Sequence, residues 1–390
     1  MADQLPDTDR DLPRVVVAQH VIDKIVHGAL LYPDIETGEA MIGLIAPQSG
    51  RQEPDIYVLD TISPGEHVLR KWGMFEQGDD WQGDVLHWLY VNWEAFRELR
   101  RPSYGSALAA KWDLPLGHVG DWHKHPGDMT EPSVDDTVTA RHIIDDSETP
   151  VEYFLVPIVT MYTLGAEKPP SAGEQPAGEK AEAAQGAAGP GQVLAAVAAE
   201  FEAAIPGKRK DVAADVPSRA IVKTLKDKGS TIRIDFWYMS KRARRFVAIT
   251  PVVWTDDRLP GLPPVAWHLA HPKRFDQEYS LLTEAGYSVD IVRWDADGKP
   301  PYEICFSVYQ PGSKHVIVLV TSVDYPAQMP AVRIAPLVGV TDDEDVFEKV
   351  YEVSQPVPTT QMPDWTWDSK RTLIELVWHV EKTLKEDGES

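Results

Sequence analysis

The sequence predicts a mixed α/β (α+β) protein with more than one folded domain. The chain has 390 residues, whereas a typical domain has about 150. Apolar runs of strand length alternate with segments whose apolar residues recur at helical spacing. One long stretch, 165–192, contains no large apolar residue and cannot contribute to a core. These observations predict sheets covered by helices, with a low-complexity segment between them.

Before that stretch, the apolar residues of 15–31 recur at helical spacing. The segments that follow have the apolar runs of buried strands or the capping and periodicity of helices, and Ser133 is a plausible N-cap. The expected elements are strands within Glu39–Pro47 and Asp55–Ser63, a helix within His87–Arg101, a strand within Gly117–Gly127, a helix from Ser133 to Asp146 and a central strand over Val151–Thr163.

After that stretch, Ala-rich Val193–Ile205 is expected to form a short amphipathic helix or to continue a linker, and the alternating segments of Ser230–Trp254 predict a hairpin that returns to the first sheet. Three prolines between 260 and 264 predict a domain boundary near 257. Beyond it we expect a helix within His271–Gly286, three strands between 287 and 324, a turn region at Tyr325–Ile334 and a closing helix at Ser369–Glu386.

The expected organisation has five parts. They are an acidic flexible tail at 1–13, a first domain core at 14–164, a low-complexity insertion or linker at 165–210, the remaining strands of the first domain at 211–256 and a C-terminal α+β domain with an antiparallel meander at 257–390.

Charge and cysteine content restrict the possible partners and compartment. The 38 Lys and Arg against 61 Asp and Glu give a net charge of −23, which argues against nucleic acid and anionic lipid as partners. A single cysteine, Cys305, excludes an internal disulfide and any cysteine-rich zinc cluster. No apolar run is long enough to span a bilayer. A soluble protein in the cytoplasm is therefore expected.

Four residues in "HKHPGDMTEPSVDD" have the spacing of a metal site. His123 and His125 point to one face of a strand, and a helix that begins near Ser133 places Asp136 one turn from its start. Two imidazoles and one carboxylate can converge on a tetrahedral cation and leave its fourth position open, as in a catalytic zinc site. The alternative is structural: the histidines bond within the strand and Ser133 merely caps the helix.

The same residues resemble the signature of the JAMM (JAB/MPN) metalloproteases, and "ETGEAMIGL" resembles their upstream Glu-Thr-Gly-Gly segment, with Glu39 at the second Gly. The resemblance implies a mixed sheet with helices on both sides and one Zn²⁺ per chain. It assigns the general acid/base to Glu36 rather than Glu39. Zinc would acidify a water molecule, and the Ser133 hydroxyl would stabilise the oxyanion.

Three neighbouring residues are weaker candidates for the same site. Asp121 and Trp122 precede the first histidine, so one is expected to shape the pocket wall, and Asp121 is a candidate partner of a ligand, although a solvated carboxylate is the more ordinary role. His142 is a candidate fifth contact, although a surface or core histidine is the more ordinary interpretation.

The C-terminal part resembles the ubiquitin-conjugating and RWD fold through its element order and its turn residues Tyr325, Pro326 and Pro330. Conjugating enzymes carry their thioester cysteine after this turn, but no cysteine follows Pro330 here. Cys305 precedes the turn, inside a predicted strand, where a small buried side chain is the usual role. The resemblance therefore implies a domain that binds rather than transfers; a generic α+β domain is the alternative.

Together the two resemblances imply a zinc-dependent isopeptidase that removes a ubiquitin-like protein from a lysine or trims its C-terminal tail. The expected partners are a ubiquitin-like protein or its conjugates and, through the C-terminal domain, other members of such a conjugation pathway, with no nucleic acid and no membrane. Two alternatives stay open: a metallopeptidase that acts on small peptides or sulfur-carrier tails, and a binding scaffold with an inert metal site.

Overall fold

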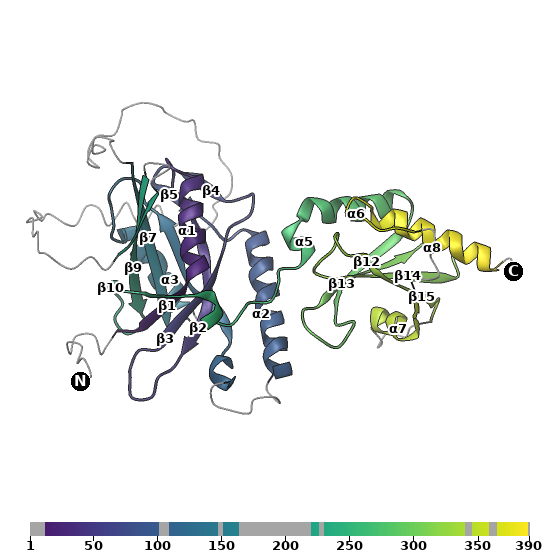
Figure 1. Cartoon of the computed structure of the whole chain (residues 1–390), viewed down its shortest axis with the longest axis horizontal. Coiled ribbons are helices and arrows are strands. Elements are labelled where there is room, and N and C mark those ends of the chain that lie inside the picture. Colours follow the sequence, from purple (N-terminus) through teal and green to yellow (C-terminus); the bar gives the residue numbers. More distant parts are fainter. Residues whose placement is uncertain are drawn as a thin grey trace, which may run out of the picture. The chain divides into compact units, whose positions relative to one another are not determined.

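The computed structural model describes residues 12–100, 109–146, 151–163, 220–225, 230–339, 345–358 and 365–388. The chain divides into two compact units, each formed by two separate segments (Figure 1). Unit 1 comprises Met1–Gln77 and His118–Leu259, and unit 2 comprises Gly78–Gly117 and Pro260–Ser390.

Unit 1 is built on one mixed sheet of nine strands, in the order β10-β9-β7-β6-β2-β3-β1-β11, with β8 paired to β9. The strands are β1 (Arg14–Ala18), β2 (Gly38–Ala46), β3 (Asp55–Ile62), β6 (Leu116–Lys124), β7 (Tyr153–Thr163), β8 (Ile221–Leu225), β9 (Ser230–Ser240), β10 (Val247–Ile249) and β11 (Val252–Trp254). Parallel pairs join β1 to β3 and β11, and β6 to β7. A small hairpin of β4 (Leu69–Lys71) and β5 (Met74–Glu76) stands apart from this sheet.

Helices cover both faces of the sheet. Helix α1 (Gln19–Leu31) buries Val21, Ile22 and Ile25 in the larger core, which contains one face of β7. Helix α3 (Val134–Asp145) buries Ala140 and Ile144 in a second core with the other face of β7. Because both faces are covered, the strands β2 and β7 are almost continuously apolar rather than alternating. The mixed α+β architecture expected from the sequence is confirmed.

The expectation of helical structure from residue 15 is wrong for the first four residues. Val15–Ala18 belong to strand β1, and the helix begins only at Gln19. In β1, Val16 lies opposite both Tyr57 of β3 and Val252 of β11. Three consecutive β-branched residues favour a strand, and pairing with two distant segments outweighs the apolar spacing that continues into the helix.

The expected hairpin in Ser230–Trp254 forms between β9 and β10, where Phe236 lies opposite Ile249. The end of that segment behaves differently, because β11 pairs with β1 at the other end of the sheet. The returning chain therefore contributes strands to both ends of the sheet.

Unit 2 contains an antiparallel sheet in the order β12-β13-β14-β15-β16. The expected helix, meander and closing helix are present. The end of the expected turn region, Ala331–Ile334, instead belongs to strand β15 (Ala331–Pro336), which pairs with the preceding strand, and α7 and β16 were not expected either. The elements are α2 (Asp80–Arg100), the 3-10 turn Ala109–Trp112, α5 (Trp267–Ala270), α6 (Pro272–Glu284), β12 (Ser288–Trp294), β13 (Glu303–Tyr309), β14 (His315–Thr321), β15 (Ala331–Pro336), α7 (Val346–Val353), β16 (Gln355–Val357) and α8 (Leu373–Gly388).

Helix α2 lies in the range 14–164 that was expected to form the first domain, but its contacts place it in unit 2. The indole nitrogens of Trp81 and Trp88 donate to the carbonyls of Leu269 and Pro264 at 2.9 and 3.0 Å. The side-chain carbonyl of Asn92 accepts a hydrogen bond from the amide of Tyr302 at 2.8 Å. Its tryptophans thus find their partners about 180 residues later in the chain, which no local pattern reveals. The second crossing into unit 2 falls between Leu259 and Pro260, close to the expected boundary at 257.

A buried carboxylate holds the Tyr-Pro turn of unit 2 in place. Glu278 on α6 is fully buried and accepts hydrogen bonds from the Tyr325 hydroxyl, the Arg274 guanidinium and the amide of Leu373 at the start of α8. All four groups are polar, and their mutual pairing offsets the cost of burial. The turn, α6 and α8 are therefore fixed to one another.

Several expectations fall on residues outside the described ranges: the tail at 1–11, the insertion at 165–210 and the possible helix at Val193–Ile205. Among the described helices, none combines the length and apolar character needed to cross a membrane.

Candidate metal centre

The end of strand β6 and the residue that follows it direct the two histidines of the motif to one face. His123 lies opposite Ile158 of β7, and the amide of His125 donates to the carbonyl of Val159 at 3.0 Å, so strand pairing continues through both residues. Alternation sends Trp122 and Lys124 to the other face, where both are almost completely buried. The pairing to β7 therefore fixes the spacing and direction of both imidazoles.

The start of α3 orients the carboxylate. Ser133 is the N-cap of this helix, as expected, and forms a reciprocal capping box with Asp136. The Asp136 amide donates to the Ser133 hydroxyl oxygen at 3.1 Å, and the Ser133 amide donates to Asp136 Oδ2 at 2.6 Å. The capping interaction satisfies two amides at the helix start and holds the carboxylate in one orientation.

The three expected ligands converge. Asp136 Oδ1 lies 3.1 Å from His123 Nε2, and its Oδ2 lies 3.3 Å from His125 Nε2. The two imidazole Nε2 atoms are 2.9 Å apart, and the three ligand atoms all lie within 4.8 Å of one another. His125 Nδ1 faces the carbonyl of Met129 at 3.1 Å, which favours a proton on Nδ1 and leaves Nε2 as a lone-pair donor. Two imidazole nitrogens and a carboxylate fit the preferences of Zn²⁺.

The electrostatics of the cluster favour a cation. Burial opposes ionisation of Asp136, but hydrogen bonds from His123 and His125 outweigh it and hold the pKa of this carboxyl well below its usual range. Burial also opposes protonation of His123, yet the hydrogen bond and charge of Asp136, together with the charge of Glu36, raise the pKa of His123 above its ordinary value. The carboxylates thus create a site that attracts positive charge.

Glu36 lies beside this cluster, on the turn between α1 and β2. Its pKa is raised by burial and by the charge of Asp136, while the charges of His123 and His125 act in the opposite direction. Its amide donates to the carbonyl of Lys71 at 3.1 Å, which ties the turn to the β4–β5 hairpin. Glu36 is therefore a half-buried carboxyl in electrostatic contact with all three ligands.

Glu39 has different surroundings. Its carboxylate accepts a hydrogen bond from the Ser63 hydroxyl, and Thr61 and Trp122 also interact with it. Burial raises the pKa of Glu39, and neither ligand histidine contributes to that shift. Of the two glutamates in this segment, Glu36 alone interacts with the ligand cluster.

Lys124, between the two histidines, was not singled out from the sequence. Its ammonium group donates to the carbonyls of Tyr32 and Pro33, the latter at 2.6 Å, and its amide donates to the carbonyl of Thr37 at 2.7 Å. The residues that Lys124 contacts lie on both sides of Glu36 in the chain. Strand alternation places Lys124 on the face opposite the two histidines, the face that α1 covers. A lysine at such a buried position is unusual, and this was the sequence signal that could have identified it.

The weaker candidates lie elsewhere. Asp121 pairs with His118 at 2.8 Å rather than with a ligand histidine. Trp122 is fully buried in the α1 core and donates to the Thr61 hydroxyl at 3.0 Å, so it does not form a pocket wall. His142 is exposed on α3 and is not part of the ligand cluster, because six residues beyond Asp136 places it about 120° away around the helix.

No known family model matches the chain, and no curated protein sequence matches it either.

Proposed function

We propose that unit 1 is a zinc-dependent isopeptidase or protease of the JAMM type. Its substrates are ubiquitin-like proteins joined to lysines, or precursors with C-terminal tails that are trimmed. The observation that carries the proposal is the convergence of His123, His125 and Asp136 within 4.8 Å, next to the carboxyl of Glu36. A strand and a capped helix from separate parts of the chain hold these groups, which is the arrangement that the sequence motif implies.

His123, His125 and Asp136 would hold the metal, and bound Zn²⁺ supplies a polarised carbonyl and a water molecule that is acidic at neutral pH. The Glu36 carboxyl takes the proton of the attacking water and delivers it to the leaving amine. Burial raises the pKa of Glu36, and a carboxyl with a raised pKa is better matched to such a two-way transfer.

Ser133 has a hydrogen atom available for the oxyanion. Its hydroxyl oxygen accepts from the Asp136 amide, so the hydroxyl proton remains free to donate to a substrate oxygen that gains negative charge. The same capping contact limits the rotation of the Ser133 side chain, so that little reorganisation is required during the reaction.

Unit 2 is proposed to bind the conjugated protein or a pathway partner without performing thioester chemistry. Cys305 is completely buried in β13. Burial, and then the charge of Glu303, raise the pKa of the Cys305 thiol to about 12. A thiol in this state has almost no thiolate at neutral pH and is not accessible to a large substrate.

The proposal is tested with zinc-loaded full-length protein and a panel of Gly-Gly-linked isopeptides and whole ubiquitin-like conjugates. Cleavage at the isopeptide bond, lost on zinc removal and restored by zinc, is the expected result. Glu36→Gln provides an inactive protein with intact ligands, and Glu39→Gln is its matched control. If the protein cleaved small peptides but no conjugate, the metallopeptidase alternative would hold. If it bound zinc but cleaved nothing, the alternative of a binding scaffold would hold.

A further inference from the structure

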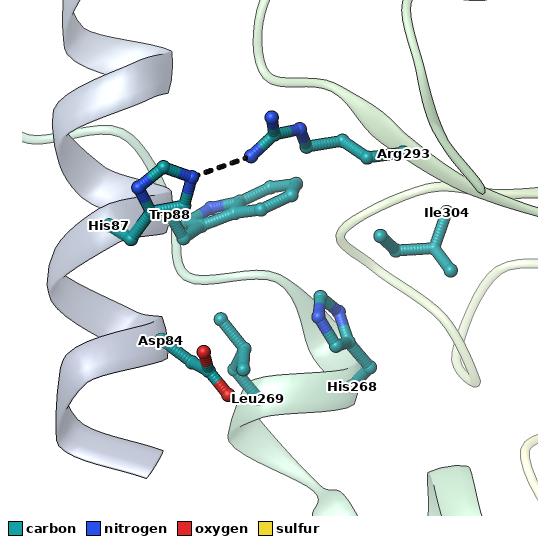
Figure 2. A pocket seen from close by; sticks show the side chains of 7 residues that line it. All are labelled: Asp84, His87, Trp88, His268, Leu269, Arg293 and Ile304. Carbon is teal, nitrogen blue, oxygen red and sulfur yellow. Dashed lines mark hydrogen bonds between the residues drawn. The ribbon is translucent and has the colours of Figure 1, made fainter. Parts of the chain in front are cut away.

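Unit 2 contains a pocket that the proposed reaction does not use. It has a volume of about 390 Å³ and lies between α2, the short helix α5 and strands β12 and β13 (Figure 2). Asp84, His87 and Trp88 enter it from α2, and His268 and Leu269 enter it from α5. Hydrogen bonds from Trp81 and Trp88 to the segment around α5 fix these two walls relative to each other, so the pocket is preformed.

The centre of the pocket is apolar and aromatic. Trp88, Leu269 and Ile304 are each less than a tenth exposed, and the indole nitrogen of Trp88 is already bonded to Pro264. The imidazole of His268 packs edge-on against Trp88, with ring centroids 5.8 Å apart. Burial lowers the pKa of His268 to about 4, so this imidazole is neutral at physiological pH and adds no charge to the pocket.

Two opposite charges stand at separate places on the rim. Arg293 Nη1 lies 3.3 Å from His87 Nε2, the dashed contact in Figure 2, and its guanidinium also lies over the ring of Tyr302. Neither partner is an anion. Asp84 lies about one turn before His87 on α2, in the lower part of the same view. In the described part of the chain, neither Asp84 nor Arg293 forms an ion pair.

A ligand that complements this pocket carries a carboxylate for Arg293, an ammonium group for Asp84 and an apolar body between them. Asp84 and His87 are three residues apart on a helix, roughly 4.5 Å along its axis, and the guanidinium lies beyond His87. An extended dipeptide spans up to about 7 Å, whereas a single amino acid spans half of that. The separation therefore favours two residues.

We propose that this pocket binds a short peptide with free termini and apolar side chains, of dipeptide size. The planar guanidinium of Arg293 receives the C-terminal carboxylate, because such pairs form two parallel hydrogen bonds. Asp84 receives the N-terminal ammonium group. The side chains contact Trp88, Leu269 and Ile304. This site lies in unit 2 and does not depend on the metal centre or on the proposed cleavage.

The test is isothermal titration of full-length protein with leucyl-leucine, N-acetyl-leucyl-leucine, leucyl-leucinamide and free leucine. We expect leucyl-leucine to bind with a Kd on the order of 1 mM. Acetylation and amidation should each weaken binding about tenfold, because each removes one charged contact. Free leucine should also bind more weakly, since it cannot reach both charges. Chromatography after the titration verifies that the peptides remain intact.

Variants assign each end of the peptide. Asp84→Asn should bind leucyl-leucine and its N-acetyl form equally, while the preference for a free carboxylate persists. Arg293→Gln should show the reverse pattern. Asp276→Asn, an exposed carboxylate on α6, is the matched control and should behave as the wild type. Equal affinity of the wild type for all four ligands, or no heat of binding at about 10 mM peptide, would overturn the proposal.

Discussion

The ammonium group of Lys124 donates a hydrogen bond to the carbonyl of Pro33 at 2.6 Å. This contact joins the middle of the His-x-His motif to the turn that ends at Glu36, across 91 residues of sequence. The proposed ligands and the proposed proton carrier are thereby held to each other from the far side of β6. The backbone contact from Lys124 to Thr37 strengthens the same connection.

Replacing Lys124 by Met should lower kcat and leave zinc binding intact. The substitution keeps the buried side-chain volume but leaves the carbonyls of Tyr32 and Pro33 without their donor, which costs roughly 1–3 kcal/mol of stability. The turn then no longer holds Glu36 in one position. Lys71→Met is the control, because only its backbone carbonyl contacts this turn. In a Glu36→Gln background the Lys124→Met change should cause no further loss of kcat; a further loss of similar size would contradict a role through Glu36.

We expect one zinc ion to bind per chain. His125→Ala should weaken zinc binding more than about 100-fold, because loss of a residue that only hydrogen-bonds to a ligand already weakens metal binding about 10–100-fold. Metal analysis after dialysis against a weak chelator measures the effect. His142→Ala, on the exposed side of α3, should retain the full zinc content. Stoichiometric zinc in a His123→Ala and His125→Ala double variant would exclude the assignment.

Glu36→Gln should reduce kcat by roughly 10²–10⁴ while the zinc content is unchanged, because an amide cannot carry the proton. Glu39→Gln should have a much smaller effect, since its carboxyl bonds to Ser63. Single-turnover cleavage of an isopeptide, with zinc measured on the same samples, compares the two variants. Equal rates for Glu36→Gln and the wild type would remove Glu36 from the reaction.

His268 predicts a specific dependence of stability on pH. Its folded-state pKa is about 4, below the ordinary value of 6.5, so the unfolded chain binds more protons between these values. The contribution of His268 to the free energy of unfolding is therefore constant above about pH 6.5. It falls as the pH approaches 4, by up to roughly 3 kcal/mol. His268→Gln should remove this part of the loss. Urea unfolding at about pH 7 and about pH 4.5 measures it, and identical pH dependence in both proteins would contradict the prediction.

Local patterns predicted the features that depend on near neighbours in sequence. The alternation of His123 and His125, and the cap formed by Ser133 with Asp136, act over a few residues, so the sequence was sufficient to predict them. The strands with continuous apolar runs were predicted for the same reason. The cluster itself was expected only because its residue types and spacing are those of a known motif.

The features that escaped prediction depend on distant partners. Val15–Ala18 form a strand because β3 and β11 flank them, and β11 lies more than 230 residues later. From the sequence, Trp81 and Trp88 are apolar residues on a helix, and this pattern fits either unit. Only their hydrogen bonds to the carbonyls of Leu269 and Pro264 assign the helix to unit 2. Lys124 has an ordinary position in a strand, and its side-chain contacts are with a turn that the local sequence does not specify.

The chain crosses between the units three times, after Gln77, Gly117 and Leu259. During synthesis, Trp81 and Trp88 of α2 therefore leave the ribosome long before their bonding partners Leu269 and Pro264, which follow 188 and 176 residues later. At about 5–20 residues per second this delay lasts roughly 9–38 s. For that time the indoles of Trp81 and Trp88 lack their native partners, so this surface of α2 stays exposed to solvent on the nascent chain.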